Sequence, residues 1–186
     1  MTKTPSNMLP LGTKAPKFSL TDVVSGKTVK LDDISSKCAT VIMFICNHCP
    51  YVKHINLALT SFAKDYQRKN VDIIAINAHD IENYPDDSPE NMKKAAIDNH
   101  YTFAYLFDET QEVAKAYQAA CTPDFYVFDN NLSLVYRGQF DDSRPGNSIP
   151  VTGASIRSAL DCLLSNSAIP LLQKPSLGCN IKWKEV

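Results

Sequence analysis

Two cysteines stand three positions apart in Cys46-Asn47-His48-Cys49, directly after a run of apolar residues. Thiols at this spacing can close a disulfide across the first turn of a helix. A helix N-terminus also stabilises a thiolate through its dipole and its exposed N–H groups. Because the thiolate is the nucleophile in disulfide exchange, this placement predicts a redox-active pair. Cys46, expected nearer the exposed end of the helix, would attack first, and the more buried Cys49 would follow.

A metal site is the main alternative use of the same cysteines. Structural zinc usually has four ligands from two paired clusters, and the chain has no second C-x-x-C. His48 and His54 lie close together on one short stretch, which does not readily complete a tetrahedron. We therefore expect no metal ligands and no cofactor. A copper- or zinc-binding module that uses Cys46, Cys49 and a histidine remains open as an alternative function.

Four residues could adjust the reactivity of the pair or align its substrate. Asn47 and His48 lie between the cysteines, and a protonated His48 would favour the Cys46 thiolate. A solvated histidine without this effect is the alternative. Thr122-Pro123 precedes a predicted strand, and we expect its peptide bond to be cis, as X-Pro bonds in tight turns can be.

Four other cysteines give weaker signals. Cys121 lies two residues before Pro123 and could approach Cys46, and Cys179 could act as a resolving thiol if the C-terminal segment folds over the pair. A lone cysteine is otherwise commonly a small buried hydrophobe. The remaining two cysteines, Cys38 and Cys162, give no clear functional signal.

Two groups of polar residues differ in what they indicate. His79 and Asp80 follow a buried strand and could assist proton transfer. Asp86 and Asp87 are expected to be solvated loop charges.

Composition indicates an ordinary globular protein. The chain has 186 residues, of which 44% are hydrophobic and 21% charged, with a formal net charge of −1. We expect one domain over residues 1–186, with residues 1–16 as an extended N-terminal arm. No basic run with interleaved aromatics suggests nucleic acid, and no apolar stretch suggests a membrane span. Without an apparent secretion signal, a cytoplasmic location is expected, where a structural disulfide framework is unfavoured.

The elements that must position the pair follow from apolar periodicity. Residues 40–45 form an unbroken apolar run typical of a buried strand, and residues 71–76 form the next. Between them, apolar residues recur at steps of three and four, which predicts a helix with one buried face. This face consists of Val52, Ile55, Leu59, Phe62 and Tyr66.

The remaining pattern completes an α/β fold. An N-terminal hairpin is predicted over 17–31, helices over 88–99 and 112–119, a second hairpin over 125–137 around Asp129-Asn130-Asn131, and a last helix over 154–164. A βαβ unit followed by an antiparallel hairpin and a closing helix is the thioredoxin topology. We therefore predict a central mixed β-sheet flanked by helices, with the first hairpin as an addition.

The sequence resembles the thioredoxin-like superfamily, and within it the alkyl hydroperoxide reductase/thiol-specific antioxidant (redoxin) family. Four segments in the matching order carry the resemblance: residues 15–20, the CNHCPYVK segment at 46–53 typical of a peroxiredoxin-like subgroup, 121–128 around the proline, and 178–184. The resemblance implies that Thr122 and Pro123 lie against the cysteine pair and align an extended substrate.

The activity implied by this resemblance is thiol-based oxidoreduction. The leading function is dithiol–disulfide exchange through Cys46 and Cys49, with protein or small-molecule disulfides as substrates and a dithiol electron donor. A thiol peroxidase with antioxidant activity is the alternative. Peroxidatic cysteines of the superfamily follow a Thr or Ser by three residues, whereas Met43 stands three before Cys46. Arg137 is the candidate for binding peroxide oxygens, and a surface residue of the second hairpin is the alternative.

Overall fold

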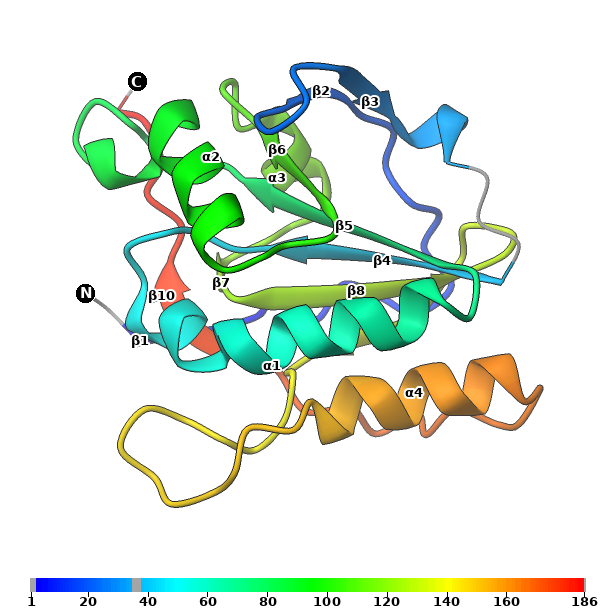
Figure 1. The fold of residues 1–186 in the computed structure, drawn as a ribbon. Coiled ribbons are helices and arrows are strands. Elements are labelled where there is room, and N and C mark those ends of the chain that lie inside the picture. The colour runs from blue at the N-terminus through cyan, green and yellow to red at the C-terminus, as the bar shows by residue number, and fades with distance from the viewer. Residues whose placement is uncertain (1–2, 35–37, 186) are drawn as a thin grey trace.

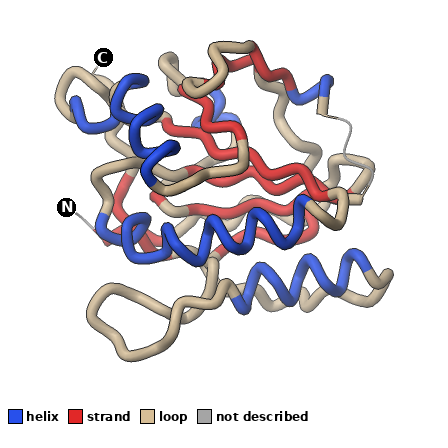
Figure 2. The backbone as a smooth tube through the Cα atoms, in the orientation of Figure 1, coloured by secondary structure: helices blue, strands red, loops and turns tan. Residues whose placement is uncertain are grey.

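A computed structural model describes residues 3–34 and 38–185 of the chain. Its main sheet has seven strands in the order β3-β2-β6-β5-β4-β8-β9 (Figures 1 and 2). The strands of this sheet, in chain order, are β2 (Ser19–Asp22), β3 (Thr28–Lys30), β4 (Ala39–Phe44), β5 (Val71–Asn77), β6 (Ala104–Phe107), β8 (Asp124–Asp129) and β9 (Leu134–Gly138). β4, β5 and β6 are parallel, and the other pairs are antiparallel.

Alternation along the central strand β4 divides the interior into two cores. Val41 and Met43 face one side of the sheet, where α1 (Pro50–Gln67), α2 (Pro89–Asp98) and α4 (Ala154–Leu164) pack. Ile42 and Phe44 face the other side. Because successive side chains of a strand point to opposite faces, an unbroken apolar run is buried on both. The predicted buried strand therefore lies at the centre of the sheet.

The second side of the sheet is covered by irregular segments and one short helix. α3 (Glu112–Ala116) supplies Val113 and Ala114 to this core, and the chain before β2 supplies Leu9 and Phe18. Figure 1 shows α1 and α4 lying side by side across the opposite face. None of the helices in the described ranges is long and apolar enough to cross a bilayer.

The predicted helix between the two buried strands is confirmed. All five residues of its predicted apolar face are buried in α1, which starts at Pro50 with the proline at the favoured N1 position. The helices predicted at 88–99 and 154–164 correspond to α2 and α4. Ser88 caps α2 by accepting a hydrogen bond from the Asn91 N–H at 3.4 Å.

Other boundaries differ for identifiable reasons. The strand predicted from residue 132 begins at Leu134, because Leu132 lies in the turn with φ +56°. The helix predicted to 119 ends at Ala116, and Gln118 has φ +51°. β6 was not predicted, since its four residues are too few to show a periodicity of their own.

A second, three-stranded sheet was also not predicted. It has the order β1-β10-β7, formed by β1 (Lys3–Pro5), β10 (Leu177–Asn180) and β7 (Cys121–Thr122). Part of the expected N-terminal arm thus pairs with the C-terminal segment. Short strands like these arise from pairing between distant segments rather than from local propensity. The small sheet places Cys179 opposite Thr122.

The chain passes from the small sheet to the main sheet at Thr122-Pro123, whose peptide bond is cis as predicted. Asp124 follows and is fully buried at the start of β8. Its Oδ1 accepts the Phe125 N–H at 3.1 Å and its Oδ2 accepts the Tyr126 hydroxyl at 3.0 Å. Burial nevertheless dominates and raises the pKa of the Asp124 carboxyl to about 7.

This raised pKa predicts a pH-dependent stability. The unfolded chain ionises Asp124 near pH 4 and the folded chain only near pH 7, so the folded state holds more protons between these values. The free energy of unfolding of the wild type, relative to Asp124→Asn, should therefore fall as pH rises from about 4 to 7 and level off above. Urea denaturation of both proteins across this range measures the difference. A constant difference would contradict the assignment.

Candidate functional site

The cysteine pair lies in the connection between β4 and α1. β4 ends at Phe44 and α1 begins at Pro50, so Cys49 is the N-cap residue and Cys46 lies in the preceding loop. The expectation that both sulfurs share the opening turn is therefore wrong, and only Cys49 occupies the helix N-terminus. Cys46 is also not exposed: the two residues are 1% and 0% accessible, respectively.

Thr122 contacts both cysteines. Its Oγ1 lies 3.1 Å from Cys46 Sγ, and its carbonyl oxygen lies 3.2 Å from Cys49 Sγ. The segment of the cis peptide bond thus packs directly on the pair, in agreement with the position that the sequence resemblance implies for Thr122 and Pro123. No residue close to Cys46 in the sequence supplies such a hydroxyl. It comes from Thr122, 76 positions further along the chain.

The two remaining candidate thiols differ in position. Cys179 Sγ lies 2.8 Å from Cys49 Sγ, so the C-terminal segment does reach the pair. Cys121 does not take the place beside Cys46 that the sequence suggested, because the contact is made by Thr122. The Cys121 thiol instead donates to the Pro123 carbonyl oxygen at 3.8 Å, and burial raises its pKa far above the usual value.

The three neighbouring thiols, Cys46, Cys49 and Cys179, differ in pKa. A hydrogen bond from Cys46 lowers the pKa of Cys49 to about 5, and a hydrogen bond from Cys179 and the Val52 N–H act in the same direction against burial. Burial raises the pKa of Cys46, and its donation to Cys49 and the charge of Asp87 raise it further. Burial and donation to Cys49 raise the pKa of Cys179 to about 12. The negative charge of the group therefore resides on Cys49 at the helix N-terminus.

Asp87 anchors the loop that carries the pair. It was expected to be a solvated charge, but it is completely buried. Its Oδ1 accepts the Asn47 N–H at 2.6 Å and the Asn77 Nδ2–H at 3.1 Å, and its Oδ2 bonds to His48 Nδ1. Burial alone would raise the pKa of Asp87, but the hydrogen bonds from His48, the stronger, and from the Asn47 N–H help to hold it below the usual value.

His48 is held by a carboxylate and by two aromatic rings. Its ring stacks on Tyr84 with centroids 5.3 Å apart and meets the His79 ring edge-on at 5.0 Å. Asn47 is held as well, because its side chain donates to the Asp86 carbonyl oxygen at 2.8 Å and accepts from the Tyr105 hydroxyl at 3.2 Å. Both residues between the cysteines thus have defined orientations.

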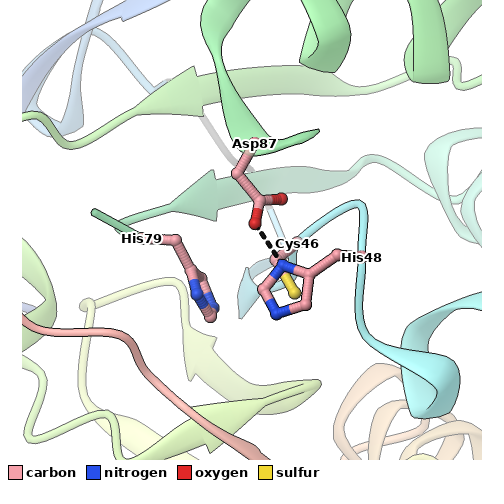
Figure 3. Close-up of side chains that lie close together, drawn as sticks. All are labelled: Cys46, His48, His79 and Asp87. Atoms are coloured by element: carbon pink, nitrogen blue, oxygen red, sulfur yellow. Dashed lines mark hydrogen bonds and ion pairs between the residues drawn. The ribbon is translucent and has the colours of Figure 1, made fainter. Parts of the chain in front are cut away.

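His79 completes the group from the end of β5. It is 1% exposed, and burial lowers the pKa of its imidazole to about 4, so the ring is neutral at pH 7. Figure 3 shows its ring beside the His48 ring and the Cys46 sulfur. The sequence indicated His79 through its place after a parallel strand, whereas nothing in the sequence singled out Asp87 as buried. Asp80 points elsewhere and binds the Asn83 side chain at 2.6 Å.

A pocket lies beside Cys46. It has a volume of about 480 Å³, lies between α1 and α2, and has Cys46 and Asn47 on its wall. Arg137, the candidate for binding peroxide oxygens, is engaged on β9 instead, where its Nη1 donates to Gln173 Oε1 at 2.8 Å. Of the two cysteines of the pair, Cys46 is the one on the wall of this pocket.

A thiol pair at a β4–α1 connection, packed against a cis proline on a mixed sheet, defines a thioredoxin-like protein. The AhpC/TSA family model matches residues 11–137, and the chain belongs to this family. No curated protein matches it.

Solved structures agree with this fold. The chain is 62% identical to an uncharacterized conserved protein from Geobacillus kaustophilus, with a TM-score of 0.98 and coverage of 100% of this chain and 98% of that one. The thioredoxin domain of thiol-disulfide oxidoreductase BVU-2223 from Bacteroides vulgatus is 18% identical, with a TM-score of 0.61 and coverage of 80% and 96%. Peroxidoxin BcpB from Mycobacterium tuberculosis is 16% identical, with a TM-score of 0.62 and coverage of 83% and 96%. The two distant structures share the fold.

The packing of β10 on the site predicts an effect of Gly178→Ala. A Cβ at Gly178 would lie 2.0 Å from the Thr122 carbonyl oxygen, a backbone atom that cannot rotate away. The substitution should push β10 from Thr122 and lower the free energy of unfolding by about 1–3 kcal/mol. Urea denaturation monitored by fluorescence measures this, and an unchanged midpoint and slope would refute the tight contact.

Proposed function

We propose that the protein is a thiol–disulfide oxidoreductase that works through Cys46 and Cys49. The observation that carries this proposal is the juxtaposition of the two thiols with each other and with Thr122 at the helix N-terminus. Family membership and the thioredoxin-like fold support redox chemistry at this position. Disulfides of proteins or small molecules are the proposed substrates, and a dithiol is the proposed electron donor.

Cys46 is the proposed attacking residue, because it borders the pocket whereas Cys49 is completely enclosed. The Cys46 thiolate attacks one sulfur of the substrate disulfide, forms a mixed disulfide and releases the other sulfur as a thiolate. Cys49 then attacks the Cys46 sulfur, closes the Cys46–Cys49 disulfide and releases the second thiolate. Two electrons pass to the substrate, and one proton, that of Cys46, leaves the pair, because Cys49 is already a thiolate at pH 7. The backbone of Thr122 and Pro123 is proposed to align the substrate.

His48 is proposed to receive the proton of Cys46. Asp87 bonds to His48 Nδ1, which leaves Nε2 as the available nitrogen of the ring. A nucleophile, a base and a carboxylate that orients the base are the usual elements of an activated thiol. Asn47 is proposed to keep this loop in place through its bonds to Asp86 and Tyr105.

Substitution of each cysteine should separate the two steps. Cys46→Ser should reduce insulin-disulfide reduction to the uncatalysed rate, because it removes the attacking sulfur. Cys49→Ser should stop after the first attack and accumulate a mixed disulfide detectable by mass spectrometry. Cys162→Ser on α4 is the matched control and should retain activity. Full activity of either active-site variant would defeat the proposal.

A thiol peroxidase with antioxidant activity is the second candidate function. It is favoured by the Thr122 hydroxyl, which lies 3.1 Å from Cys46 Sγ. This hydroxyl could hydrogen-bond to a peroxide oxygen in place of the Thr or Ser that stands three residues before the peroxidatic cysteines of the superfamily. Here the Cys46 thiolate attacks the peroxide to give a sulfenic acid and an alcohol or water. Cys49 then forms the disulfide and releases water. A small oxidant also suits a thiol as buried as Cys46.

Stopped-flow oxidation by hydrogen peroxide tests this second function. The wild type should react much faster than a simple thiol of the same protonation state. Thr122→Val should lower the rate constant about 10- to 100-fold, the effect of a hydrogen bond of about 1.5–3 kcal/mol to a charged group, whereas Thr122→Ser should retain most of it. A wild-type rate equal to that of free cysteine excludes the function.

A further inference from the structure

Four potential metal-binding side chains converge beside the thiol pair. Cys46, His48, His79 and Asp87 each offer one ligand atom, and these atoms all lie within 4.8 Å of one another. They come from three separate segments: the β4–α1 loop, the end of β5 and the turn before α2. Figure 3 shows the two imidazoles and the sulfur close together. Cys49 is not a member of this group.

The histidines present nitrogen atoms without hydrogen-bond partners. Within the described residues, His48 Nε2 and both ring nitrogens of His79 are buried and form no hydrogen bond. His79 is 1% exposed, so water does not satisfy its ring from bulk solvent. Buried polar atoms are rarely left unpaired, and each exception calls for an explanation such as an ion. Two such rings side by side point to a cation between them.

Asp87 prepares His48 as a ligand rather than binding the ion itself. Its two oxygens are occupied by Asn47, Asn77 and His48. A histidine that binds a metal commonly gives its other ring nitrogen to a carboxylate, which sets the tautomer and the orientation of the ring. The bond between Asp87 and His48 Nδ1 leaves Nε2 directed away from the carboxylate (Figure 3).

We propose that these residues form a zinc site in which Cys46 Sγ, His48 Nε2 and one ring nitrogen of His79 bind the ion and Asp87 orients His48. One thiolate and two imidazoles suit Zn²⁺, and three protein ligands leave the fourth tetrahedral position for water or an exogenous ligand. The thiolate and the carboxylate together balance the charge of the ion. Binding releases the Cys46 proton to solvent.

The proposed zinc site is a property beyond the proposed redox function and does not depend on it. Its ligand set also differs from the sequence-based alternative of Cys46, Cys49 and a histidine, because Cys49 contacts Cys179 and Thr122 instead. Cys46 cannot bind zinc and attack a disulfide at the same time. Zinc binding and disulfide exchange therefore exclude each other.

Metal binding to the full-length protein tests the proposal directly. After reduction and removal of metal by a chelator, Zn²⁺ is titrated against a chromophoric competitor, and Co²⁺ is used as a spectroscopic substitute. We expect one equivalent to bind, with a thiolate-to-cobalt charge-transfer band and the intense visible bands of tetrahedral Co²⁺. Absence of stoichiometric binding, or a cobalt spectrum without the thiolate band, would overturn the proposal.

Variants identify the ligands independently of any redox activity. His79→Gln should weaken Zn²⁺ binding more than about 100-fold, and Asp87→Asn should weaken it about 10- to 100-fold, as loss of an outer partner does. Cys46→Ser should remove the cobalt charge-transfer band. His54→Gln, in which the lost ring bonds to Ser143 at 2.7 Å, and Cys162→Ser on α4 should keep the wild-type affinity.

Circular dichroism must show that each variant is folded, and His48→Gln replaces His79→Gln if the latter is not. Wild-type affinity in the histidine variants, or loss of binding in Cys162→Ser or His54→Gln, would refute this ligand set. Because affinity is measured without any disulfide or peroxide substrate, failure of the redox assays would leave the result unaffected.

Discussion

A buried carboxylate joins the parts of this site. Asp87 accepts hydrogen bonds from the backbone of Asn47 and the side chain of Asn77 and is paired with His48. Three chain segments, which follow β4, end β5 and precede α2, are thereby held together at the carboxyl ends of these two central strands. A carboxylate without water requires several donors to remain ionised, and the residues beside the thiols supply them. The position of the cysteine loop depends on this arrangement.

The second constraint comes from the opposite side of the pair. Thr122 contacts both sulfurs, and β10 packs so closely on Thr122 that only glycine fits at position 178. This contact also brings Cys179 to within 2.8 Å of Cys49. The thiols are thus enclosed between a histidine–carboxylate group and a small sheet, which explains why neither is exposed. The pocket that borders Cys46 is the route of approach that the proposed reaction uses.

The two proposals share one sulfur and differ in its partners. With Cys49, Cys46 can give up two electrons and form a disulfide; with His48 and His79, it can bind a soft-to-borderline cation. The charge of the reduced thiols resides on Cys49, under the influence of the helix N-terminus and two neighbouring thiols. Cys46 remains protonated until a base, a substrate or a metal removes its proton. Its immediate surroundings therefore decide its chemistry.

The sequence by itself determined the elements around the pair. An apolar run, a helical periodicity and a second apolar run placed Cys46 and Cys49 between β4 and α1, and α4 was predicted over the range it occupies. These elements follow from patterns within a few turns or residues, which local spacing encodes. The cis peptide bond before Pro123 was likewise predicted from its place in this topology.

Only the tertiary structure decided which distant residues meet. Thr122 rather than Cys121 contacts Cys46, Cys179 reaches Cys49 across 130 positions, and Asp87 reaches His48 across 39. Such contacts depend on the path of the whole chain and on strands too short to be predicted from periodicity. Burial was decided in the same way: an aspartate that is solvated in an isolated loop becomes enclosed when helix and sheet close over it. The residue types determine which chemistry is possible, and the tertiary packing determines which residues contact one another.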